Sequence, residues 1–176
     1  IFEQVIGIKK IEKLLRILES VKKSNSIYQS QSEHNWRLFK KDLDEHNLLT
    51  SSVANFTDNL WIPFLGKSGR SILQSKEILE ILRKVSDEKE FIMWQNMLFD
   101  KSTGTIDHID TYYLDTYPRG NLIAAWIALE NTNEEGGTFH IYPRSHLNVP
   151  DDWKNLSHDE FTNWINEYSK KFKRKD

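Results

Sequence analysis

The sequence predicts an α+β protein in which helices come first and an antiparallel β-roll or barrel follows, with a site at its mouth. Apolar residues recur at every third or fourth position up to about residue 85, which is typical of amphipathic helices. From residue 91 the apolar residues alternate instead, which is typical of strands. A chain of 176 residues can form one domain with a sizeable core, so we expect a single domain over residues 1–176.

Residues 1–90 are expected to be mainly helical. In residues 5–21 apolar side chains are spaced by Lys, Glu and Arg, as in a helix that packs one face against a domain. Residues 36–49 and 71–85 show the same period, and we expect a helix in each. Residues 50–69 contain proline and two glycines, which favours an irregular segment between these helices.

A β-core is predicted in residues 91–146. Residues 91–99 and 121–130 carry apolar side chains at both odd and even positions, as expected for strands covered on both faces. Residues 131–137 form a polar stretch that ends in two glycines, which predicts a turn, and residues 138–142 alternate again. An antiparallel arrangement of these strands would complete the roll.

The segment 147–176 is expected to be a helical insertion between strands. Ser157 precedes Glu160 by three residues, which is the pattern of a capping box at the start of a helix. Phe161, Trp164 and further apolar residues then follow at helical spacing.

Composition narrows the class of protein. Cysteine is absent, which excludes disulfides and zinc–thiolate sites and suits a reducing compartment, so we expect a cytoplasmic location. The formal net charge of −2 gives no reason to expect nucleic acid or a membrane as a partner. No run of about 18 apolar residues is present, so no membrane span is predicted.

The stretch after the first predicted strand carries the chemistry. His108 and Asp110 are two residues apart, so on an extended backbone both side chains project from the same face. An imidazole nitrogen and a carboxylate oxygen directed at one point are two thirds of the facial set of two His and one carboxylate that binds non-haem Fe(II). The pair is therefore a candidate metal site.

Five sequence elements around this pair resemble the phytanoyl-CoA dioxygenase family. They occur in the family's order and at about its spacing: Trp94-Gln95-Asn96-Met97, His108-Ile109-Asp110, Ala125-Trp126-Ile127-Ala128-Leu129-Glu130, Glu135-Gly136-Gly137-Thr138-Phe139 and Tyr142-Pro143-Arg144-Ser145-His146. The resemblance implies a double-stranded β-helix, the jelly-roll or cupin-like fold, here incomplete and preceded by helices.

The same resemblance implies an enzyme, with iron ligands at His108 and Asp110. It places Met97 and Trp126 near the co-substrate 2-oxoglutarate. The implied activity is an Fe(II)- and 2-oxoglutarate-dependent dioxygenase that uses O₂ to hydroxylate an aliphatic C–H of a small organic substrate. In related halogenases a small residue replaces the aspartate, so Asp110 favours hydroxylation. The sequence does not name the substrate.

Two departures from the family pattern stand out. The family has glycine where this chain has Arg144, and glycine is the residue that freely adopts a positive φ. The family's distal histidine and the arginine that pairs with 2-oxoglutarate come later than residue 146, and we find no match for either. We therefore expect a fragment truncated at the C-terminus, with an incomplete site.

Two alternatives stay open at this point. One is a non-catalytic β-roll binding module that keeps His108 and Asp110 but never completes a metal site. The other is a cupin-type metal enzyme without 2-oxoglutarate, in which His140 or His146 is the third ligand.

Overall fold

The computed structural model describes residues 2–102, 104–118, 120–132, 139–149 and 153–171. The chain forms two compact units, Ile1–Thr103 (unit 1) and Gly104–Asp176 (unit 2). The described residues form four α-helices and two small antiparallel sheets, which confirms the α+β class. The described residues do not form a jelly-roll. The single domain over 1–176 and its division at residues 90 and 146 stay predictions.

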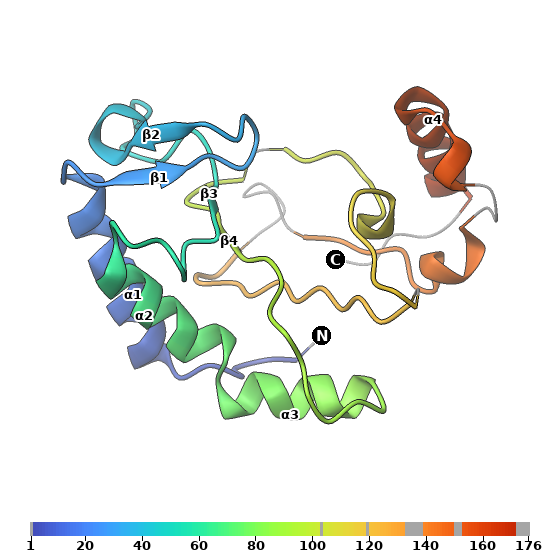
Figure 1. The fold of residues 1–176 in the computed structure, drawn as a ribbon, viewed down its shortest axis with the longest axis horizontal. Coiled ribbons are helices and arrows are strands. Elements are labelled where there is room, and N and C mark those ends of the chain that lie inside the picture. Colours follow the sequence, from blue (N-terminus) through green and yellow to red (C-terminus); the bar gives the residue numbers. More distant parts are fainter. Residues whose placement is uncertain (1, 103, 119, 133–138, 150–152, 172–176) are drawn as a thin grey trace. The chain divides into compact units, whose positions relative to one another are not determined.

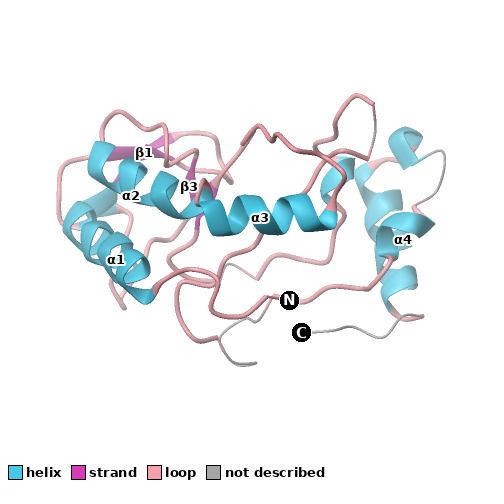
Figure 2. Cartoon of the chain, turned by 90° about the horizontal axis from the view of Figure 1, so that it is seen from below, coloured by secondary structure: helices cyan, strands magenta, loops and turns pink. Residues whose placement is uncertain are grey.

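Unit 1 holds most of the regular structure (Figure 1). Its elements are α1 (Ile8–Lys22), β1 (Ile27–Gln29), β2 (Trp36–Leu38), the 3-10 helix η1 (Phe39–Lys41), β3 (Val53–Ala54), α2 (Pro63–Leu73), α3 (Lys76–Val85) and β4 (Met97–Leu98). The first predicted helix is confirmed by α1, which buries Leu14 and Leu18. Helices α1 and α2 lie side by side in both views (Figures 1 and 2).

The α2 helix begins within the segment that we predicted to be irregular. Pro63 stands at its start, where its missing N–H costs nothing. Gly69 lies so close to the ring of Phe56 that a Cβ atom there would be 2.2 Å from the nearest ring carbon. The helix predicted over residues 71–85 is in fact interrupted, because Ser75 caps the start of α3 and its hydroxyl accepts a hydrogen bond from the N–H of Ile78.

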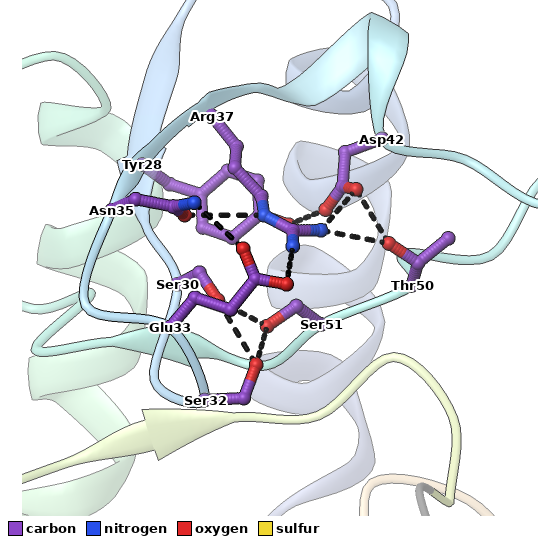
Figure 3. Close-up of polar contacts among 9 residues, drawn as sticks. All are labelled: Tyr28, Ser30, Ser32, Glu33, Asn35, Arg37, Asp42, Thr50 and Ser51. Atoms are coloured by element: carbon purple, nitrogen blue, oxygen red, sulfur yellow. Dashed lines mark hydrogen bonds and ion pairs between the residues drawn. The ribbon is translucent and has the colours of Figure 1, made fainter.

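The helix predicted for residues 36–49 is wrong. The segment instead starts as β2, which pairs antiparallel with β1 so that Tyr28 lies opposite Arg37. The Arg37 guanidinium binds the carboxylates of Glu33 and Asp42, each at 2.6 Å (Figure 3). Asp42 also accepts a hydrogen bond from the Tyr28 hydroxyl. These side-chain bonds stabilise a hairpin followed by a turn.

The strand predicted over residues 91–99 is reduced to β4, which pairs with β3 and places Leu98 opposite Val53. Ile92 and Trp94 are 91% and 74% exposed, so the expected cover on both faces is wrong. The physical reason is that β3 offers two residues for pairing. Beyond them, the side-chain carbonyl of Asn96 accepts a hydrogen bond from the backbone N–H of Thr57 at 3.2 Å.

Unit 2 contains the short 3-10 helices η2 (Asp110–Tyr112), η4 (Ser145–Asn148) and η5 (Trp153–Asn155), followed by α4 (His158–Ser169). The predicted capping box is confirmed, since Ser157 and Glu160 each accept a hydrogen bond from the other's backbone N–H. The core of the unit is formed by Trp153, Phe161 and Ile165.

The strand predicted over residues 121–130 is wrong, because these residues run without ladder pairing. Residues 139–142 belong to no named strand either, and residue 138, with most of the predicted turn over 131–137, lies outside the described residues. Among the described helices, none combines the length and the apolar character needed to cross a bilayer.

Candidate metal centre

His108 and Asp110 meet in unit 2. Ile109 between them is extended, with φ −119° and ψ 122°, and its side chain packs against the core of the unit. Alternation along an extended backbone then directs the two neighbouring side chains away from the core, to the same side. His108 Nε2 lies 3.1 Å from Asp110 Oδ1, and the two side chains are 34% and 53% exposed.

The other ring nitrogen of His108 fixes its tautomer. Nδ1 lies 2.8 Å from the carbonyl oxygen of Ile106, which can only accept a hydrogen bond. Nδ1 therefore carries a proton, and in the neutral ring the lone pair is on Nε2, the atom that faces Asp110. A metal-binding histidine commonly donates its second N–H in this way, because the bond fixes the ring orientation.

Each member of the pair changes the ionisation of the other. The hydrogen bond to Asp110 raises the pKa of His108 against the opposing effect of burial. The same bond lowers the pKa of Asp110, again against burial. When the His108 ring is cationic, its Nε2–H therefore donates to Asp110 Oδ1.

The donor set fits a metal ion. Neutral imidazole and carboxylate are suitable ligands for Fe(II). Two donors at right angles and about 2.1 Å from one ion are about 3.0 Å apart, close to the separation of Nε2 and Oδ1. Among the described residues, however, no group of three or more His, Asp or Glu side chains could hold a metal ion. His140 and His146 therefore do not complete the set as the structure has it.

The segment after the pair is anchored on α4. The ring of Tyr112 stacks on Phe161 with centroids 4.0 Å apart and an angle of 9° between the planes. The Tyr112 hydroxyl donates to the carbonyl of Leu156 at 3.3 Å. Since Tyr112 is the last residue of η2, which begins at Asp110, the α4 helix supports the carboxylate from one side of the pair.

On the other side of the pair, Asp107 binds two side chains from a later segment. Its Oδ1 lies 2.7 Å from His140 Nε2, and its Oδ2 accepts a hydrogen bond from the Tyr142 hydroxyl at 2.9 Å. Sequence reasoning gave Asp107 and Tyr142 no role. A signal was present, because His140 and Tyr142 are two residues apart and so share a face of an extended segment.

The profile of the phytanoyl-CoA dioxygenase (PhyH) family matches residues 3–175, nearly the whole chain. The chain belongs to the phytanoyl-CoA dioxygenase family. Comparison with curated proteins and with solved structures gives no match. The family is one of oxygenases that in general depend on Fe(II) and 2-oxoglutarate, and the pair of His108 and Asp110 provides the kind of donors that such an oxygenase requires.

The two residues expected near 2-oxoglutarate have different surroundings. Trp126 lies in unit 2, where its ring stacks on Phe139 at 5.3 Å with 13° between the planes. Met97 lies in β4 of unit 1, opposite Ala54, and its side chain is 41% exposed. Their roles toward the co-substrate stay predictions.

The family's glycine position has a left-handed backbone here. Arg144 has φ 63° and ψ 15°, the conformation that glycine adopts most readily. A left-handed backbone costs a non-glycine residue about 1–2 kcal/mol. Arg144 adopts this conformation directly before η4, in which His146 lies exposed.

Proposed function

We propose that this protein is an Fe(II)- and 2-oxoglutarate-dependent dioxygenase that hydroxylates an aliphatic C–H bond of a small organic substrate. His108 and Asp110 provide two of the metal ligands in this proposal. The observation that carries it is the 3.1 Å separation of Nε2 and Oδ1, in a chain that belongs to the phytanoyl-CoA dioxygenase family.

When bound, Fe(II) and 2-oxoglutarate supply the activation of O₂: one oxygen atom goes to the substrate as a hydroxyl group, and the other goes to succinate as CO₂ is released. The chain supplies the ligands and their orientation. His108 offers Nε2 while its Nδ1–H is held by the carbonyl of Ile106, and Asp110 offers a carboxylate whose pKa is lowered, so that it is ionised at neutral pH.

The family resemblance also gives Trp126 and Met97 a role toward 2-oxoglutarate, and we propose that role for each of them. The support for Trp126 is its stacking on Phe139, which orients the indole while 48% of the side chain is exposed to solvent. The support for Met97 is its partial exposure next to a paired backbone.

Metal binding tests the ligands. We expect the chain to bind Mn²⁺, a redox-stable substitute for Fe(II), and we expect His108→Ala and Asp110→Ala each to weaken that binding by at least about tenfold. His46→Ala is the matched control, because His46 is exposed and is not one of the proposed ligands, so its replacement should leave the affinity unchanged. Equal Mn²⁺ binding by the wild type and by His108→Ala, including no binding by either, refutes the proposed ligands.

Product analysis tests the reaction. With Fe(II), O₂ and 2-oxoglutarate, the proposal requires succinate release that depends on His108. One observation favours the non-catalytic alternative, since the described residues gather no third ligand around the pair. Metal binding without succinate release would support that alternative, and metal-dependent turnover that needs no 2-oxoglutarate would support the cupin-type enzyme.

A further inference from the structure

Asp107 is held at both carboxylate oxygens by one later segment of unit 2. His140 Nε2 lies 2.7 Å from Oδ1, and the Tyr142 hydroxyl donates to Oδ2 at 2.9 Å. The Asp107 and His140 side chains are 29% and 24% exposed, so the contacts are partly shielded from water. A carboxylate bound at both oxygens cannot rotate without losing one bond, so the contact fixes the direction of the Asp107 side chain.

The position of Asp107 in the chain links this contact to the candidate metal centre. It directly precedes His108, and it directly follows Ile106, whose carbonyl accepts the hydrogen bond from His108 Nδ1 at 2.8 Å. A change in the backbone angles of Asp107 would therefore move the imidazole and the carbonyl that orients it relative to each other. Asp107, His108 and Tyr142 also line one small pocket.

We infer that Asp107 is a positioning residue. Through His140 and Tyr142 it holds the backbone from which His108 projects, so that Nε2 stays beside Asp110 in a geometry that can bind one metal ion. The inference rests on the proposed function, since it assumes that the His108–Asp110 pair binds metal. In this inference His140 helps to position the ligand His108 and does not bind the metal itself.

The first test measures Mn²⁺ affinity in the whole chain. Asp107→Ala removes both contacts, and we expect it to weaken Mn²⁺ binding by about 10- to 100-fold, the range found for residues that orient metal ligands. Tyr142→Phe and His140→Gln each remove less and should weaken it by a smaller factor. If Asp107→Ala does not fold, these two variants still test the inference. Thr116→Val is the matched control, because it also removes a hydroxyl hydrogen bond in unit 2, to the carbonyl of Pro118, and should leave the affinity unchanged.

Two further readouts separate positioning from general stability. The ¹⁵N shifts of the His108 ring report which nitrogen carries the proton, and Asp107→Ala should disturb the Nδ1–H form, while Thr116→Val should not. The double variant Asp107→Ala/Tyr142→Phe should bind Mn²⁺ no more weakly than Asp107→Ala alone, since both act through one contact.

The outcomes are distinct. If His108→Ala lowers Mn²⁺ affinity but Asp107→Ala does not, the inference is overturned and the proposed ligands stand. An additive loss in the double variant also overturns it. If His108→Ala has no effect on Mn²⁺ binding, the proposed function itself fails, and the inference fails with it.

Discussion

Replacing Asp100 with Ala tests whether a buried charge pair holds unit 1 together. The Lys22 side chain is 1% exposed, and its Nζ lies 2.9 Å from Asp100 Oδ2. The same oxygen accepts a hydrogen bond from the backbone N–H of Leu49, also at 2.9 Å. After the replacement, Lys22 keeps one anionic partner, Glu19, at 2.5 Å, and that side chain is half exposed.

The expected cost follows from these contacts. Removing one partner of a buried ion pair costs about 3–5 kcal/mol. The unpaired N–H of Leu49 adds about 1–3 kcal/mol, and the retained contact with Glu19 offsets a similar amount. We therefore expect the free energy of unfolding to fall by about 3–5 kcal/mol, which at a urea m value of about 2 kcal/mol/M lowers the midpoint by about 2 M.

Urea unfolding followed by circular dichroism measures this change. Lys170→Gln is the control, because it breaks the exposed pair with Glu167, whose loss should cost less than about 1 kcal/mol. If Asp100→Ala lowers the free energy of unfolding no more than Lys170→Gln does, the argument that Asp100 stabilises the buried charge of Lys22 is refuted.

The same pair predicts a dependence on alkaline pH. Burial opposes the charged form of Lys22, but the hydrogen bonds to Glu19 and Asp100 outweigh it and raise the pKa of Lys22. A raised pKa means that the stabilisation is fully present below the unfolded-state pKa of about 10.4 and is lost as the pH rises through the higher folded-state value. The urea midpoint of the wild type should thus fall more steeply above pH 10 than that of Lys22→Met. Parallel curves for the two proteins would contradict the shift.

Two further variants test packing and capping. Gly69→Ala should cost about 1–3 kcal/mol, because the new Cβ would lie 2.2 Å from the Phe56 ring. Gly7→Ala, at the N-cap of α1, meets no atom within 4 Å and should cost less than about 1 kcal/mol in the same urea titration. Ser157→Ala removes the cap of α4 and should cost about 1 kcal/mol, with hydrogen exchange accelerated in the first turn of that helix; unchanged protection there would show that the capping box does not stabilise it.

The sequence predicted elements that local interactions determine. The start of α4 depends on Ser157 and Glu160, which bond to each other across three residues, so a short pattern was enough. Residues 36–49 have helical periodicity as well, but their structure depends on pairing with β1 and on the bond from Tyr28 to Asp42. No local pattern contains those partners.

In the candidate metal centre too, the local contact was predicted from the sequence and the long-range contact was not. The contact between His108 and Asp110 depends on one extended residue, and their spacing alone predicted a shared face. The contact of Asp107 with His140 joins residues 33 positions apart, and its existence depends on how the later segment returns. The sequence gives the residue types but not the distance between Asp107 and His140. It therefore suggested His140 either as a metal ligand or as a structural residue, and did not decide between the two.

Unit 1 is completed by its last residues. Lys22 and Val53 are synthesised well before their partners Asp100 and Leu98, and α2 and α3 lie between. Helices form early from local contacts, whereas pairing across 78 residues must wait for the chain between. A nascent chain that has not reached residue 100 therefore carries a lysine without its buried counter-ion and a β3 edge without a strand to cover it.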